Sequence, residues 1–267
     1  MSSLSPAERV LQELGITDPS EIDLEAIAWH LGARIKFREL DDCEARIIGY
    51  RERAVITIDR RSPRRRRRFS IAHELGHWRH HRNRMLMCRS DDIGSRSPRT
   101  PRIERVADGY AADLVLPHYL FVPISRQYNR LNFQTVRSLA ELFDTSLTAT
   151  AIRLTESKHS PAVLICHGPG GRKWFTRSPD LPDRWFPQEE LDAESFAFEL
   201  LFGSGQEEAH PRVIGADAWF DRSEAQRYEV HEQSVRIGED EILTLLTIRD
   251  DEMLEDRSST SSWRRRS

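Results

Sequence analysis

His73, Glu74 and His77 combine residue types and a spacing that suit metal-assisted hydrolysis. They form the pattern H-E-x-x-H in the segment HELGH. Four residues are slightly more than one α-helical turn, so both histidines lie on one helix face and can share a metal ion. Glu74 directly follows the first ligand, close enough to reach a metal-bound water. If the ion is zinc, it lowers the pKa of that water, and Glu74 acts as the base that passes the proton to a leaving amine.

A catalytic zinc site needs a third protein ligand and one open position. Position 83, where a metzincin would have a third histidine, is Asn83, which excludes that subtype. In the segment RIERVADGYAAD, Glu104, Ala107, Asp108 and Ala111 share one helical face, and the small alanines allow close packing. We therefore predict Glu104 as the third ligand, which would make the site gluzincin-like. Asp108 is expected to accept a ring N–H from a ligand histidine, with the alternative that Asp108 replaces Glu104 as ligand.

Two helices must bring these groups together. Ser62 and Pro63 read as an N-cap and a first helical residue, which predicts a helix from Pro63 to about His81. Pro101 and Pro117 bound a second helix. Gly76 has no side chain, which leaves room for that second helix to approach. Before them we expect short helices over 7–15 and 22–31 and strands over 33–40, 45–50 and 54–59, and between them a loop over 85–100.

The rest of the chain predicts more helices and then a second domain. Residues 134–156 have the rhythm of a helix-turn-helix, but Leu147, Thr148, Ala149 and Thr150 offer bases few hydrogen bonds, so we interpret the segment as packing structure. From residue 158 we expect strands flanking a turn at 168–171, a helix over 194–203 and a strand pair over 227–237 and 241–250. We predict an α+β fold with domains 1–157 and 158–256 and a disordered tail, 257–267.

Composition limits the class of protein. The chain has 267 residues, 38% of them hydrophobic, and a net charge of −3. It has no apolar run long enough to span a membrane and no secretory signal, and its three widely spaced cysteines do not suggest a disulfide framework. We expect a soluble cytoplasmic protein without a membrane partner. Cys88 and Cys166 have no partner at zinc-site spacing and are interpreted as buried thiols.

The run Arg64–Arg68 places five positive charges at a helix N-terminus, where they oppose the helix dipole. A solvated surface explains most such runs. The alternatives are compensation by the acidic C-terminal region, an acidic substrate, or nucleic acid. Nucleic acid is the weaker alternative, because arginine is the usual cation throughout this chain.

The sequence RFSIAHELGH over 68–77 and the motif E-x-x-AD-x-YAADL-x-LP over 104–117 resemble the ImmA/IrrE family of zinc metallopeptidases. The resemblance extends over about residues 7–156. It implies a zincin-like domain, a small sheet with active-site helices and then a helical bundle, in which His73, His77 and Glu104 hold Zn²⁺ and Glu74 is the catalytic base. Asp108 stands where the family usually has Asn, and Tyr110 where it usually has Phe.

Members of that family often cut helix-turn-helix repressors in the cytoplasm and so release stress or mobile-element genes. The first hypothesis is therefore a zinc endopeptidase acting on such a repressor. The second is a DNA-binding or sensor regulator with a structural zinc and no proteolysis. A third is that residues 158–256 bind a ligand or partner that controls the protease.

Overall fold

The computed structural model describes residues 4–81, 86–88, 93–96 and 100–255, which form two compact units. Unit 1 extends to residue 127 and includes residues 137–150; unit 2 comprises residues 128–136 and continues from residue 151. The division falls inside helices α6 (Phe133–Leu142) and α7 (Leu147–Glu156). The expected α+β class is confirmed, whereas the domain boundary near residue 158 stays a prediction.

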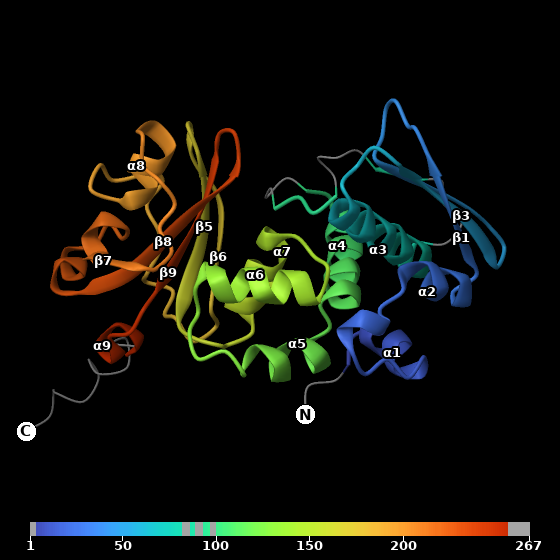
Figure 1. Ribbon diagram of the computed structural model, residues 1–267, viewed down its shortest axis with the longest axis horizontal. Helices are drawn as coiled ribbons and strands as arrows, with labels where there is room; N and C mark the ends of the chain where they lie inside the picture. The colour runs from blue at the N-terminus through green and yellow to red at the C-terminus, as the bar shows by residue number, and fades with distance from the viewer. Residues whose placement is uncertain (1–3, 82–85, 89–92, 97–99, 256–267) are drawn as a thin grey trace, which may run out of the picture. The chain divides into compact units, whose positions relative to one another are not determined.

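Unit 1 combines a small sheet with helices (Figure 1). Its remaining elements are α1 (Pro6–Glu13), α2 (Leu24–His30), β1 (Ala33–Arg38), β2 (Ala45–Tyr50), β3 (Arg53–Asp59), α3 (Arg64–His80), β4 (Leu86–Cys88), α4 (Arg102–Val115) and α5 (His118–Ser125), with a 3₁₀ turn at Pro19–Glu21. Among the described residues, no helix has the length and apolar character needed to cross a membrane.

The sheet of unit 1 has the strand order β1-β3-β2-β4, and only the β1–β3 pair is parallel. Helix α3 packs on β2: a Cβ on Gly49 would lie 2.5 Å from the Trp78 ring. The Trp78 indole also donates a hydrogen bond to the Leu31 carbonyl at 2.8 Å. The face of α3 opposite the candidate ligands is thus fixed to the sheet and to the end of α2.

The first two helices of unit 1 start on side-chain caps, whereas α3, α4 and α5 each start after a proline N-cap without one. Ser5 and Glu8 form a reciprocal capping box on α1, and Asp23 caps α2. The prediction that Ser62 caps α3 with Pro63 at the first helical position is wrong by one residue. Pro63 has an extended backbone (φ −56°, ψ 150°), and α3 starts at Arg64 without a side-chain cap. A proline N-cap has no hydroxyl to offer, so α3 depends on tertiary packing for its N-terminus.

The predicted loop over 85–100 contains a strand, which corrects that expectation. Residues Leu86–Cys88 form β4, an edge strand antiparallel to β2 with Cys88 opposite Ala45. Three residues are too few to show the alternation by which a strand is recognised in sequence. Residues 82–85, 89–92 and 97–99 lie outside the described part, as does the predicted disordered tail.

The helix-turn-helix-like segment is confirmed as two helices, α6 and α7, joined by a turn at residues 143–146. Leu139 and Phe143 are buried, and the Phe143 ring lies 5.4 Å from that of Phe121 in α5. Asp144 in the turn adopts a left-handed backbone (φ 51°). The apolar face of these helices therefore forms core, in agreement with the packing interpretation.

Unit 2 is built on a five-stranded sheet of order β6-β5-β9-β8-β7. The strands are β5 (Ala162–Gly168), β6 (Gly171–Arg177), β7 (Arg212–Gly215), β8 (Glu229–Gly238) and β9 (Glu241–Thr247), with helices α8 (Phe196–Phe202) and α9 (Asp251–Leu254) and two 3₁₀ turns at Ala216–Ala218 and Ser223–Arg227. The predicted strand pairs and the helix over 194–203 are confirmed, while β7 was not predicted.

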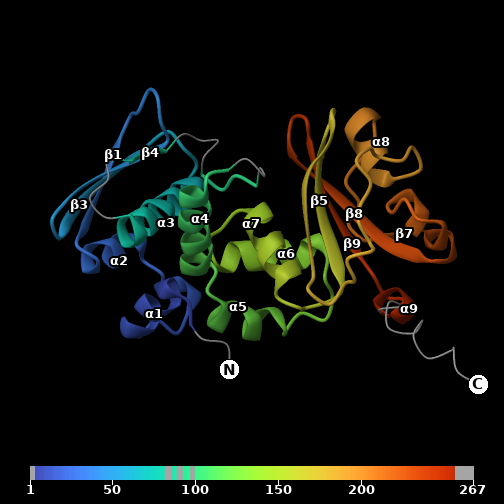
Figure 2. The ribbon, with the colours of Figure 1, turned by 180° about the vertical axis from the view of Figure 1, so that it is seen from behind.

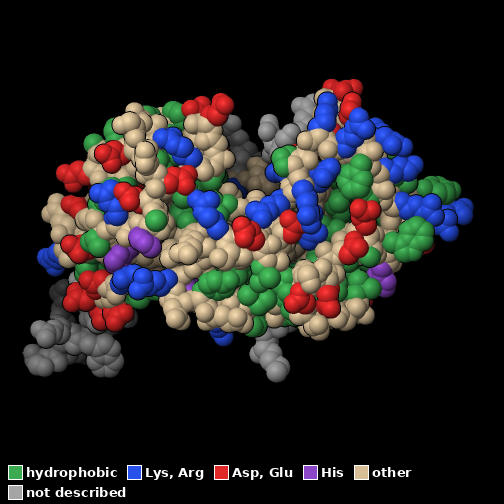
Figure 3. Space-filling view, in the orientation of Figure 1, with side chains coloured by type: hydrophobic (Ala, Val, Ile, Leu, Met, Phe, Trp, Pro, Cys, Tyr) green, Lys and Arg blue, Asp and Glu red, His purple; other side chains and the backbone are tan. Residues whose placement is uncertain are grey.

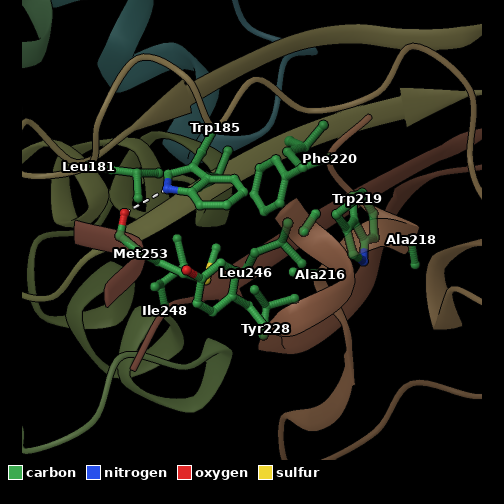
Figure 4. Packing of buried hydrophobic residues seen from close by; sticks show 14 of the residues in the cluster. Leu181, Trp185, Ala216, Ala218, Trp219, Phe220, Tyr228, Leu246, Ile248 and Met253 are labelled. Carbon is green, nitrogen blue, oxygen red and sulfur yellow. Dashed lines mark hydrogen bonds between the residues drawn. The ribbon is translucent and has the colours of Figure 1, made fainter. Parts of the chain in front are cut away.

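An aromatic cluster forms the core of unit 2 (Figure 4). Trp185 is fully buried, its ring lies 5.4 Å from that of Phe220, and its indole donates to the Met253 carbonyl at 2.6 Å. Close by, His167 at the end of β5 is also fully buried, 5.9 Å from the Trp219 ring, and neither ring nitrogen has a hydrogen-bond partner. Burial, helped by the positive charge of Arg172, lowers the pKa of His167 to about 4.

We expect His167 to make the stability of unit 2 depend on pH. The unfolded chain takes up this proton near pH 6.5, whereas the folded chain does so only near pH 4. The stabilisation is therefore complete above pH 6.5 and is lost as the pH falls to 4, by up to about 3 kcal/mol. Calorimetry of the full chain should show a weaker loss over this range in His167→Gln, whereas the exposed control His210→Gln should match wild type. If His167→Gln loses as much stability as wild type when the pH falls, the pH dependence does not come from His167.

Candidate metal centre

The two helices that carry the candidate ligands, α3 and α4, lie side by side in both views of the ribbon (Figures 1 and 2). Their crossing depends on Gly76, as the sequence suggested. A Cβ at that position would lie 2.9 Å from both the Cα and the carbonyl oxygen of Ala107 and 3.2 Å from the Tyr110 Cβ. Since Cβ atoms do not approach backbone that closely, the lack of a side chain at Gly76 sets the separation of the helices.

Three donor atoms meet at this crossing. The Nε2 atoms of His73 and His77 are 3.0 Å apart, and the Glu104 Oε2 lies 3.1 Å from the first and 3.2 Å from the second. Both histidine side chains are fully buried, and that of Glu104 is 13% exposed. The structure thus brings together the three residues predicted as ligands, in a nearly equilateral triangle closed to bulk water on the α3 side.

Asp108 orients the first histidine. Its Oδ1 lies 2.8 Å from His73 Nδ1 and also accepts the Gly94 backbone N–H at 2.8 Å. A carboxylate at this distance favours the tautomer with the proton on Nδ1, which leaves a lone pair on Nε2 at the triangle. Asp108 thus contacts the ring nitrogen of His73 that is not part of the triangle, and both its supporting role and its alternative role as ligand stay predictions. On His77, Nδ1 faces His81 Nδ1 at 3.3 Å.

The electrostatics of the cluster favour positive charge. Burial alone would lower the pKa of His73, but hydrogen bonds to Asp108 and Glu104 outweigh it and raise the pKa to about 9. Burial opposes ionisation of Glu104, yet its hydrogen bonds to both histidines lower its pKa to about 2. Two carboxylates beside two imidazoles thus create a field in which a cation between the donor atoms is stabilised.

Glu74, on the same helix as the two histidines, is a buried acid whose carboxylate oxygens both lack a hydrogen-bond partner. Its side chain is fully buried, and neither carboxylate oxygen has a hydrogen-bond partner of ordinary geometry. Burial raises the pKa of Glu74 to about 7, although the positive charge at His73 and the nearby Cys88 thiol lower it. A buried carboxylate without a hydrogen bond is costly in a folded protein and calls for a ligand or a catalytic role.

The donor set and its spacing fit a tetrahedral zinc ion. With zinc–ligand distances of about 2.0–2.1 Å, adjacent donors in a tetrahedron are about 3.3 Å apart, close to the 3.0–3.2 Å found. Two imidazoles and a carboxylate are the ligands of one known class of catalytic zinc site. Cys88 also belongs to the cluster, with all four ligand atoms within 4.8 Å of one another. The burial of Cys88 was expected from the sequence, but its place beside the histidines was not, because nothing local to Cys88 indicates a metal site.

The arginine run at the start of α3 is compensated inside unit 1. Arg64, Arg65 and Arg68 contact Asp144 in the α6–α7 turn at 2.9, 3.7 and 3.3 Å, and Arg66 makes a two-pronged pair with Glu44 at 2.7 and 2.9 Å. These acids offset the unfavourable helix dipole that the sequence indicated.

Further cations lie on the exposed side of β1. Arg34, Lys36 and Arg38 alternate along β1 on its exposed side, and Figure 3 shows basic side chains gathered over this part of unit 1.

Comparison with known protein families finds a match for the part of the chain that carries the candidate metal centre. A family model described as Peptidase_M78, IrrE N-terminal-like domain, matches residues 28–155, which include both ligand helices. Residues 28–155 are a Peptidase_M78 domain. This match confirms the resemblance to the ImmA/IrrE family for that part of the chain. A search of curated protein sequences finds no significant match.

The solved structures similar to this chain include a Mycobacterium tuberculosis transcriptional regulator. The alignment covers 90% of this chain and 74% of the other, at 13% sequence identity and a TM-score of 0.55. At this identity the similarity shows a shared fold. The alignment therefore extends beyond the residues that the family model matches.

The Gly76 crossing yields a direct test of the metal centre. Gly76→Ala forces the two ligand helices apart, and overpacking of this kind costs about 1–3 kcal/mol. We expect a lower melting temperature and Zn²⁺ affinity at least about tenfold weaker in a chelator-competition titration. The matched control is Gly109→Ala in α4, where a Cβ meets nothing within 4 Å. That variant should keep its zinc affinity and gain about 0.5–1 kcal/mol of stability. Equal zinc affinity in both variants would contradict the proposed geometry.

Proposed function

We propose that this chain is a cytoplasmic zinc-dependent endopeptidase that cleaves a regulatory protein, with a helix-turn-helix repressor as its substrate. The observation that carries the proposal is the convergence of three donor atoms within 3.2 Å of one another, beside the buried Glu74 on the helix that carries the two histidines. Membership of a peptidase family in residues 28–155 supports it.

Each residue of the centre has a distinct role in this proposal. Zn²⁺, when bound by His73, His77 and Glu104, polarises the scissile carbonyl and acidifies water. Glu74 accepts the proton of the attacking water on its carboxylate and delivers it to the nitrogen of the leaving amine. Its burial suits both steps, because a base with a pKa near neutrality can accept a proton and release it again. Asp108 keeps the His73 ring in the orientation and tautomer that binding needs.

The substrate class rests on the family resemblance of the sequence. The similar Mycobacterium tuberculosis protein is described as a transcriptional regulator, which fits a role in transcriptional control for this fold. A repressor encoded by a neighbouring gene would be the first substrate to test.

A second candidate function is a DNA-binding regulator in which zinc is structural. The observation that favours it is the row of exposed cations on β1, Arg34, Lys36 and Arg38. Such a protein would bind duplex DNA with an affinity that falls steeply with salt, and the loss of Glu74 would leave that binding unchanged.

Glu74→Gln separates the two functions. The amide keeps the shape of the side chain but cannot take a proton, so we expect cleavage of the repressor to fall by about 10²–10⁴-fold while zinc stays bound. Cleavage is followed by mass spectrometry of the products, and zinc by elemental analysis. The partner variant His73→Ala should lose both zinc and cleavage. If Glu74→Gln cuts as fast as wild type, Glu74 is not the base; salt-sensitive DNA binding without any cleavage would favour the regulator.

A further inference from the structure

Cys88 reaches the candidate metal centre from the sheet rather than from the ligand helices. Its side chain is 2% exposed, and its Sγ belongs to a set of four ligand atoms, with those of His73, His77 and Glu104, that all lie within 4.8 Å of one another. The other three atoms already form the triangle with sides of 3.0–3.2 Å. The sulfur is therefore the remaining donor of the cluster.

The backbone of Cys88 is tied to the helix that carries the histidines. The Glu44 N–H donates to the Cys88 carbonyl at 3.1 Å, as part of the β2–β4 pairing. The Glu44 carboxylate in turn accepts hydrogen bonds from α3, from Arg66 Nε and from the Ser70 hydroxyl, both at 2.7 Å. One buried residue thus connects the edge strand with α3, so the sulfur is held in a defined place relative to the imidazoles.

The chemistry of this donor set has a specific meaning for zinc. Thiolate, imidazole and carboxylate are all good zinc ligands, and a set of four completes the tetrahedron. Zinc peptidases keep three protein ligands and leave the fourth position to water or substrate. A sulfur ligand in the fourth position would leave no coordination position for water or substrate.

We infer that Cys88 is a fourth protein ligand of the metal ion, and that its thiolate takes the position which an active peptidase leaves open. The inference rests on the proposed zinc peptidase function and adds its regulation. In this state the chain is latent, with Glu74 buried beside the sulfur and no water within its reach. Departure of the thiolate restores the three-ligand site, and the thiolate takes up a proton when it leaves.

A different role for the thiol makes a different prediction. The Cys88 thiol lies close enough to Glu74 to lower the pKa of that carboxyl, as a weak S–H donor would. If it only supports Glu74, the sulfur stays protonated and never binds the metal. The experiment below distinguishes a metal–sulfur bond from a thiol–carboxylate contact.

The test is X-ray absorption at the zinc edge on the full chain loaded with an equimolar amount of Zn²⁺. We expect one sulfur neighbour at about 2.3 Å in wild type. The nearly isosteric Cys88→Ser should show only nitrogen and oxygen neighbours. Cys166→Ala is the matched control, because Cys166 is equally buried but belongs to unit 2. It should keep the sulfur signal. Co²⁺ substitution gives a second readout, a thiolate-to-cobalt charge-transfer band that is lost in Cys88→Ser alone.

Metal affinity and cleavage complete the design. Cys88→Ser should bind Zn²⁺ roughly 10–100-fold more weakly than Cys166→Ala, and it should cleave the repressor faster than wild type. Zinc bound in wild type without sulfur would overturn the inference and leave the proposed peptidase intact. A sulfur signal that persists in Cys88→Ser would overturn it as well. A folded wild-type chain that binds no zinc would overturn both proposals.

Discussion

The contact between Gly76 and Ala107 is the constraint on which the centre depends. It lets α3 and α4 approach so closely that donor atoms from both helices come within 3.2 Å of one another. Such packing buries His73, Glu74 and His77 beside a largely covered Glu104, which costs desolvation energy unless charge is compensated. A divalent cation bound there would compensate it, since it would satisfy both imidazole lone pairs and the carboxylate at once. The helix crossing and the metal chemistry are therefore two aspects of one arrangement.

Several residues outside the centre keep that crossing in place. Trp78 fixes the far face of α3 to Gly49 and to the Leu31 carbonyl, while Glu44 links α3 to the sheet through Arg66. Asp144 gathers three arginines at the helix start, where positive charge is least favourable. The arginine run is thus explained by structure, and the helix that carries the ligands is held at its start, at its middle and near its end.

The features that the sequence predicted correctly depend on residues that are close together along the chain. The H-E-x-x-H spacing and the shared face of Glu104 and Asp108 need only helical periodicity, and the structure brings those residues together as expected. The sequence did not predict strand β4 or the position of Cys88 beside the candidate ligands. A three-residue strand has too few positions to show alternation, and its pairing partner lies more than forty positions earlier, at Ala45. The proximity of Cys88 to the ligands is a product of tertiary structure alone.

A zinc titration of Glu104→Gln is the sharpest test of the centre, because Glu104 would link the second helix to the ion. The exposed Glu141→Gln, also in unit 1, is its matched control. We expect one tightly bound zinc per chain in wild type and in Glu141→Gln, and an affinity at least about tenfold weaker in Glu104→Gln. Undiminished affinity in Glu104→Gln, or a folded wild-type chain that takes up no zinc, would contradict the proposed metal centre.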